Sequence, residues 1–140
     1  KVGDRNYGEA IKLLKQKFKI CEKPIGTLEH IRLKDFFSDE LEEEKYLSER
    51  LLSVEESSYV MTNNEKLFEK HKELCVDKSI KLIKSAAMAD VEVLEKMAEF
   101  SLIKTNNSTL ALWAGLLSGS KVAFEDPKLE QTLCWAQGLS

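Results

Sequence analysis

The sequence contains one long uncharged segment in an otherwise strongly charged chain. No charged residue occurs between Lys104 and Lys121, although 32% of the 140 residues are charged. A membrane-spanning helix needs about 20 apolar residues, and this segment is shorter and begins with two asparagines. A helix that is apolar on nearly every side is normally buried among other helices. We therefore expect a buried central helix that starts near Ser108 and ends at Gly119.

Helical spacing of apolar residues dominates most of the remaining chain. Asp39 with Glu42, and Thr62 with Glu65, have the spacing of capping boxes at helix starts. Asp90 is expected to cap a further helix, and Asp126 precedes a proline that suits the first helical turn. These signals predict helices over residues 6–20, 40–59, 63–87 (in one piece or bent near Asp77), 91–103 and 128–137.

Only one segment has the alternation of a half-buried strand. After the breakers Pro24 and Gly26, apolar residues at 31 and 33 alternate with polar residues at 30, 32 and 34. The sequence thus predicts a mainly α fold, either a helical bundle or a short α-solenoid, with one isolated strand near residues 27–34. We expect an N-terminal helix and extended segment over residues 1–37 and a helical bundle over residues 38–140.

Charge and cysteine content narrow the class of protein. The formal net charge is −3, which predicts neither nucleic-acid binding nor attraction to an acidic membrane. The three cysteines, Cys21, Cys75 and Cys134, are an odd number at wide spacing, so we expect reduced thiols in an intracellular protein rather than a disulfide framework. No metal or cofactor motif occurs, and we expect neither a metal nor a cofactor.

The two histidines do not form a recognisable catalytic motif. His30 lies on the strand-like segment and His71 on a predicted helix. Cys75 follows His71 by four residues, so a helix would place both on one face, but no glycine-rich elbow or second histidine supports catalysis there. The sequence therefore favours a binding protein over an enzyme.

From Pro24 onward, the order of segments resembles a known arrangement. An extended segment is followed by the acidic helix "LEEEKYL" (Leu41–Leu47), then by "DKSIKLIKSAA" (Asp77–Ala87), and then by "VLEKMA" (Val93–Ala98). This order resembles the C-terminal part of the replisome adaptor family that links the replicative helicase to DNA polymerase alpha, also called the chromosome-transmission-fidelity and acidic nucleoplasmic DNA-binding protein family.

The resemblance implies a non-catalytic scaffold that binds short helical peptides in a shallow groove. The groove would lie between helices at 78–87 and 91–102, with an apolar floor and a rim of lysines that meets acidic partners. The floor candidates, each of which could instead be ordinary core, are Ile80, Ile83, Leu94, Met97, Leu110 and Trp113. The rim candidates are Lys81, Lys84 and Lys104.

The sequence as a whole predicts a helical adaptor that binds protein partners, with no direct contact to nucleic acid or membrane. The resemblance would give it a role in DNA replication in the nucleus, as part of a larger chain or an oligomer. Two alternatives stay open. One is an α-solenoid fragment of an unrelated complex, such as one in trafficking or transport. The other is a viral or bacterial helical domain that binds a nucleoprotein or a host factor.

Overall fold

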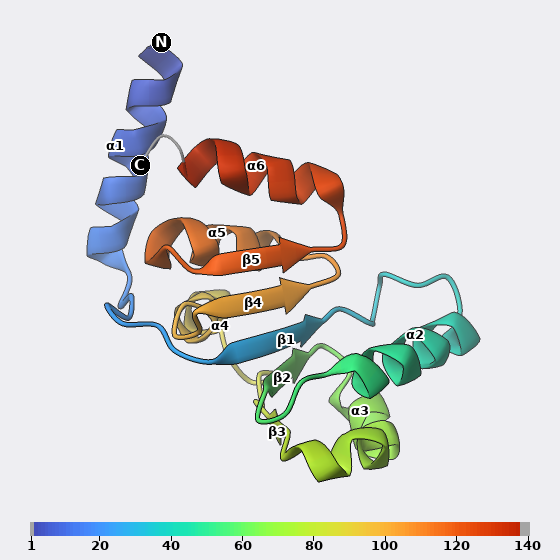
Figure 1. The fold of residues 1–140 in the computed structure, drawn as a ribbon. Coiled ribbons are helices and arrows are strands. Elements are labelled where there is room, and N and C mark those ends of the chain that lie inside the picture. Colours follow the sequence, from blue (N-terminus) through green and yellow to red (C-terminus); the bar gives the residue numbers. More distant parts are fainter. Residues whose placement is uncertain (1, 138–140) are drawn as a thin grey trace.

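A parallel five-stranded sheet forms the centre of the molecule (Figure 1). The computed structural model describes the backbone of residues 2–137 and the side chains of residues 8–136. All four strand pairings are parallel, and the spatial order is β3-β2-β1-β4-β5. The strands are β1 (Thr27–Ile31), β2 (Tyr59–Thr62), β3 (Lys81–Leu82), β4 (Leu102–Thr105) and β5 (Lys121–Phe124).

Helices connect the strands and pack on both faces of the sheet, although one face of β4 and β5 is left without a helix. They are α1 (Val2–Lys17), α2 (Glu40–Ser53), α3 (Glu65–His71), the 3₁₀ helix η1 (Lys72–Lys78), α4 (Asp90–Met97), α5 (Thr109–Ser118) and α6 (Pro127–Gln137). In Figure 1, α2 and α3 lie on one side of the sheet, and α4 and α5 lie on the other. Helices on both faces of a parallel sheet define an α/β fold.

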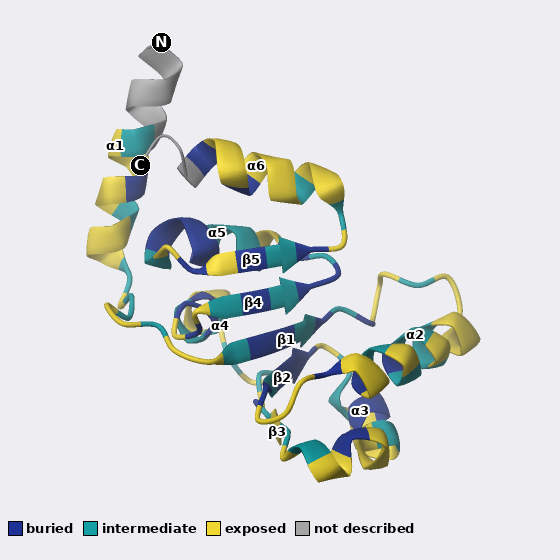
Figure 2. Cartoon of the chain, viewed as in Figure 1, coloured by how far each residue is buried: buried dark blue, intermediate teal, exposed yellow. Residues whose placement is uncertain are grey.

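Each face of the sheet has its own hydrophobic core. Successive side chains of a strand point to opposite faces, so Leu28 of β1 packs toward α4 and α5 while Ile31 packs toward α2 and α3. Leu47 and Leu51 of α2 belong to the second core and are fully buried. Figure 2 shows the buried residues concentrated along the strands and on the inner sides of the helices.

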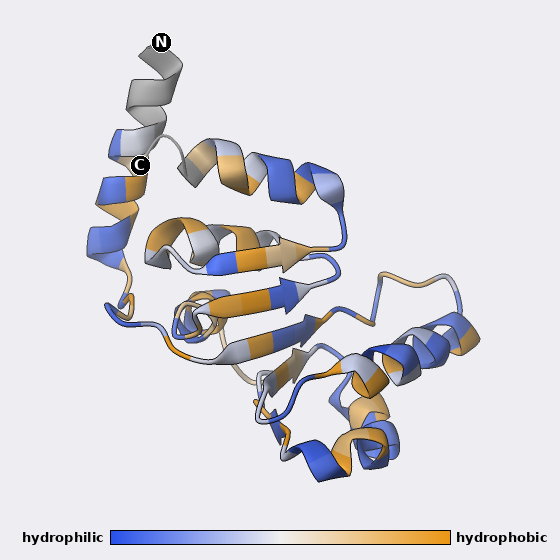
Figure 3. Ribbon diagram, in the orientation of Figure 1, coloured by the Kyte–Doolittle hydropathy of each residue, from blue (hydrophilic) through white to orange (hydrophobic). Residues whose placement is uncertain are grey.

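The uncharged segment forms α5, as expected, and this helix is largely buried. Ser108 caps it, because its Oγ accepts a hydrogen bond from the amide of Ala111 at 3.0 Å. Gly119 ends it with φ of 77°, a left-handed conformation that favours glycine. Figure 3 shows α5 as mostly hydrophobic and α2 as mostly hydrophilic. The buried helix is thus confirmed, but it packs against a sheet rather than inside a helical bundle.

The mainly α fold predicted from the sequence is wrong, because four of the five strands were missed. β2 begins at the last residue of the segment predicted as a helix at 40–59, β3 lies within 63–87, β4 overlaps 91–103, and β5 lies between two predicted helices. These strands have two to four residues, so each is too short for the alternation of a half-buried strand to stand out in the sequence. The apolar residues of a short strand next to an amphipathic helix are easily mistaken for a continuation of that helix.

The strand predicted at 27–34 is confirmed, but it is the central strand of the sheet and not an isolated one. β1 pairs with β2 on one side and with β4 on the other. Residues from the predicted 1–37 segment and from the predicted 38–140 segment therefore share one sheet.

The helix caps are partly as predicted. Asp39 caps α2 through a hydrogen bond from the amide of Glu42 at 2.8 Å. Thr62 ends β2, so the predicted cap at Thr62 is wrong, and Asn64 caps α3 instead. Asp90 is the first residue of α4 and not its cap, which is Ala89. Within residues 2–137, no helix has both the length and the apolar character that would let it cross a membrane.

We predict that Gly115→Ala destabilises the fold. A methyl group at this position of α5 would lie 2.6 Å from Cγ2 of Val122 in β5, and the stiff valine side chain cannot easily move away. We expect urea unfolding to show a loss of about 1–3 kcal/mol, whereas Gln131→Ala on the exposed side of α6 should change little. Stabilisation, the usual result of Gly→Ala in an open helix, would contradict this packing.

Candidate functional site

The order of strands reverses between β1 and β4, and this reversal creates a crevice. From β1 the chain moves outward through β2 to β3, and it then crosses back to β4 and continues outward to β5. The helix after β1 packs on one face of the sheet and the helix after β4 packs on the other. In open parallel sheets, ligands bind outside the carboxyl ends of the strands at such a reversal.

Three polar side chains follow one another on the same side of the backbone at this crevice. His30 lies near the carboxyl end of β1, Arg32 follows the strand, and Lys34 begins the turn that comes next. They alternate with Ile31 and Leu33, which are both fully buried in the core under α2. The side chains of His30, Arg32 and Lys34 therefore lie on the side of the sheet on which α4 and α5 pack.

Two asparagines hold this extension of β1 from its two sides. Asn106, after β4, accepts a hydrogen bond from the amide of Arg32 and donates one to its carbonyl, both at 2.8 Å. Asn63, after β2, accepts from the amides of Leu33 and Lys34 at 2.8 and 3.0 Å and donates to the carbonyl of Lys34 at 3.0 Å. Side-chain amides thus replace the ladder hydrogen bonds that the strand would otherwise lose.

The Arg32 side chain is oriented but keeps donors free. Its Nη1 donates to Oδ1 of Asn107 at 2.7 Å, and its guanidinium carbon lies 5.6 Å from the centre of the Phe36 ring. A guanidinium has five N–H donors, and no further partner of this group occurs among the described residues. The remaining donors can therefore bind an anionic ligand.

His30 is neutral and fixed against β4. Its Nδ1 lies 2.8 Å from the hydroxyl oxygen of Thr105. Burial is the main cause that lowers the pKa of His30 to about 4, and the positive charges of Arg50 and Arg32 lower it further. At neutral pH the imidazole is therefore an uncharged hydrogen-bonding group at the bottom of the crevice.

A cavity of about 670 Å³ opens beside this strand extension. The residues that follow β3 form one wall of this cavity, and Glu65 holds them in place. Its carboxylate accepts hydrogen bonds from the amides of Ser85 and Ala86, each at 3.0 Å. The apolar lining consists of Met61, Ala86, Met88, Val93 and Leu110. The polar lining consists of His30, Lys34, Thr62, Asn63, Asn64, Glu65, Lys66, Ser85 and Asp90. The cavity thus combines an apolar wall with convergent polar groups, as small-molecule sites usually do.

The N-terminus of α5 lies at the same edge of the sheet. Helix α5 begins just after Asn107, whose side chain already touches Arg32. The N-terminal end of a helix carries a partial positive charge, and α5 has no acidic residue in its first turn. Arg32 and this helix end therefore favour negative charge in the same part of the crevice.

The residues predicted to bind a peptide lie on several elements, although Ile83, Leu94, Met97, Leu110 and Trp113 share one hydrophobic cluster. Residues 78–87 are not helical as predicted but contain the end of η1 and the short strand β3. The apolar candidates vary: Ile83, Leu94 and Met97 are buried, and Ile80, Leu110 and Trp113 are half-buried. Lys81 and Lys84 are exposed, whereas Lys104 lies in β4, near Glu55 and Glu29 on the other face of the sheet. Peptide binding by these residues stays a prediction.

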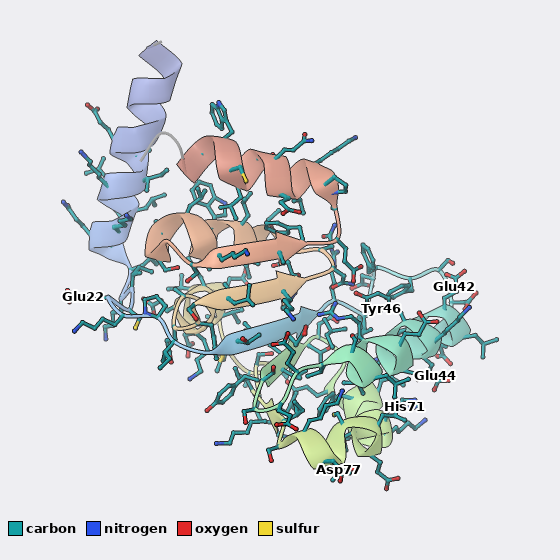
Figure 4. All side chains as sticks on the ribbon, viewed as in Figure 1. Glu22, Glu42, Glu44, Tyr46, His71 and Asp77 are labelled. Carbon is teal, nitrogen blue, oxygen red and sulfur yellow. The ribbon has the colours of Figure 1, made fainter. Side chains whose placement is uncertain are left out.

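The His71 and Cys75 pair considered in the sequence does not interact directly. His71 is the last residue of α3, and its Nε2 lies 3.8 Å from a carboxylate oxygen of Glu44 on α2. The Cys75 thiol donates to the carbonyl of Lys72 at 3.3 Å, and burial raises its pKa. Figure 4 shows His71 and Glu44 together at the side formed by α2 and α3. Among residues 8–136, whose side chains the structure describes, no group of three or more His, Cys, Asp or Glu could hold a metal ion.

Comparisons with protein-family models, with curated proteins and with solved structures found no match to this chain. The resemblance to the replisome adaptor family is therefore neither supported nor contradicted and stays a prediction.

Sequence reasoning missed the asparagines of the crevice, although the sequence carries a signal for them. The triplet Thr-Asn-Asn occurs twice, as residues 62–64 and 105–107. Each triplet ends a strand that neighbours β1, and the first asparagine of each holds the β1 extension. Finding this signal requires knowing that β2 and β4 flank β1, which a predicted helical bundle does not allow.

We predict that Asn106→Ala destabilises the fold, because it leaves the amide and the carbonyl of Arg32 without partners in a partly buried position. The expected loss in urea unfolding is about 1–3 kcal/mol. Asn107→Ala is the matched control, since that side chain bonds only to the Arg32 side chain, and it should cost clearly less. Equal losses for the two variants would contradict the role assigned to Asn106.

The lowered pKa of His30 predicts a pH dependence of stability. The folded pKa of about 4 lies below the ordinary value of 6.5, so the stabilisation is complete above pH 6.5 and is lost as the pH falls toward 4. Urea unfolding at pH 7 and pH 4.5 should show a wild-type loss of up to about 3 kcal/mol from this group. His30→Gln should lose less over the same interval. A parallel pH profile for His30→Gln would contradict this assignment.

Proposed function

We propose that this chain binds a phosphate-bearing small molecule, most fittingly a nucleotide, in the crevice between the carboxyl ends of β1 and β4. The observation that carries the proposal is the placement of Arg32 and Lys34 at the strand-order reversal, with their backbone held by Asn63 and Asn106. A preorganised arginine with free donors suits the geometry of phosphate oxygens.

The charges around the crevice support an anionic ligand. Arg32, Lys34 and Lys66 bring positive charge, and the α5 N-terminus adds its partial charge. Glu65 is one of two acidic residues in the cavity wall, and two backbone amides already satisfy its carboxylate. Phosphate groups would therefore meet more free donors than acceptors near Arg32.

The cavity next to these donors supports a ligand with a larger organic part. Its volume of about 670 Å³ is within the usual range for small-molecule sites. The side chains of Met61, Met88, Val93 and Leu110 provide an apolar wall against which a flat ring can pack. A nucleotide combines such a ring with phosphates. Parallel sheets with this strand order commonly bind nucleotides at the point where the order reverses. This comparison of strand order is an analogy between folds and does not concern the residues of the site.

The helical-peptide adaptor predicted from the sequence stays a prediction. Its nine candidate residues are divided between the core, β3, α5 and the opposite face of β4. The phosphate-binding proposal has the advantage that Lys34 and Lys66 line one cavity and that Arg32 is held against Asn107, just before α5.

Calorimetric titration with ADP, GDP, CDP and UDP, and with inorganic pyrophosphate, tests the proposal. We expect at least one of these ligands to bind the wild-type protein, and the double variant Arg32→Gln, Lys34→Gln to bind it at least about tenfold more weakly. Lys45→Gln, an exposed lysine of α2, is the matched control and should bind normally. Absence of binding by all five ligands, or unchanged affinity of the double variant, would show that the proposal is wrong.

A further inference from the structure

A buried ion pair lies behind the crevice, on the face of the sheet that α2 covers. Glu29 in the middle of β1 is only 3% exposed, and its Oε2 accepts a hydrogen bond from Nη2 of Arg50 at 2.9 Å. The same Nη2 lies 3.5 Å from the carbonyl oxygen of His30. Arg50, near the end of α2, therefore touches the two residues of β1 that come shortly before Arg32.

Tyr46 and Glu125 connect Arg50 to the end of β5, the strand next to β4. Nη1 of Arg50 donates to the Tyr46 hydroxyl, which donates in turn to Oε1 of Glu125, both at 2.6 Å. Burial raises the pKa of Tyr46, so the hydroxyl keeps its proton and remains a donor. Glu125 follows β5 directly, and its carboxylate also lies 3.5 Å from Arg50.

These contacts close a ring around the boundary between β1 and β4. The amide of Glu125 donates to the carbonyl of Thr105 at 3.1 Å, and the Thr105 hydroxyl meets Nδ1 of His30 at 2.8 Å. The ring therefore runs from Arg50 to His30, on to Thr105 and Glu125, and back through Tyr46. It joins α2, β1, β4 and the end of β5.

The ring crosses a part of the sheet that has no other cover. In Figure 1, the side of β4 and β5 that faces the viewer carries no helix of the described chain. A second cavity of about 310 Å³ lies there, with Glu29, Arg50, Lys104 and Glu125 in its lining. Since no helix packs over this region, the polar ring is the contact that ties α2 to the end of β5.

We propose that Tyr46, Arg50 and Glu125 form a clasp that positions the carboxyl end of β1, and with it Arg32, for ligand binding. This inference rests on the proposed function. The Tyr46–Glu125 hydrogen bond is the link most easily broken, because the Glu125 side chain is 51% exposed. Loss of the Tyr46–Glu125 hydrogen bond leaves Arg50 paired with Glu29, so the core stays intact. The carboxyl end of β1 is then no longer tied to the end of β5 through Tyr46.

The test uses calorimetric titration of the whole chain with inorganic pyrophosphate. We expect Tyr46→Phe and Glu125→Ala, each of which removes the Tyr46–Glu125 hydrogen bond, to weaken binding by about 3- to 10-fold. The matched control is Tyr59→Phe, because the Tyr59 hydroxyl has no hydrogen bond among the described residues and the substitution keeps the ring that packs against the core, Phe100 and Lys81. This control should bind as the wild type does.

A double-mutant cycle separates positioning from general destabilisation. Because the clasp acts through Arg32, Tyr46→Phe should have little additional effect on affinity in a protein that already carries Arg32→Gln. An equal loss in both backgrounds would overturn the clasp, and so would wild-type affinity in Tyr46→Phe. If the wild-type protein binds neither pyrophosphate nor any nucleoside diphosphate, the proposed function fails, and the clasp fails with it.

Discussion

The backbone that follows β1 leaves the sheet ladder, and its amides and carbonyls must find other partners. Asn63 and Asn106 provide them, one from each neighbouring strand. Together they make five hydrogen bonds, which hold residues 32–34 on one fixed path. An unpaired buried backbone group is costly, so this path is strongly determined. Because successive side chains point to opposite sides of this backbone, Ile31 and Leu33 enter the core while His30, Arg32 and Lys34 face the crevice.

The strand order gives this local arrangement its place in the molecule. The crossover from β3 to β4 puts the second half of the sheet beside β1, so the two Thr-Asn-Asn triplets meet on either side of one extended segment. On one face the crevice adjoins the cavity between α3, α4 and α5. On the other face Arg50 neutralises the buried Glu29 and reaches the end of β5 through Tyr46. Both faces therefore stabilise the same short stretch of backbone.

The sequence predicted the local features of the fold better than its global arrangement. Capping by Asp39 and Ser108, the stop at Gly119 and the alternation of residues 30–34 are set by neighbours in the chain, and the structure confirms them. The sheet could not be predicted in the same way, because β2 to β5 are short and their buried side chains resemble the apolar side of an adjoining helix. Without the sheet, Asn63 and Asn106 read as loop residues, and Glu29 reads as an ordinary surface charge.

The central claim is that the residues at the junction of β1 and β4 are a binding site for phosphate. It is tested most directly by a ¹H–¹⁵N NMR titration of the protein with inorganic pyrophosphate, followed by a nucleoside diphosphate. The account predicts that the largest shifts occur at the backbone amides of residues 30–34 and 106–110, and that the nucleotide adds shifts around the cavity at residues 85–93. Saturable shifts confined to other parts of the chain, or no shifts at millimolar ligand, would contradict it.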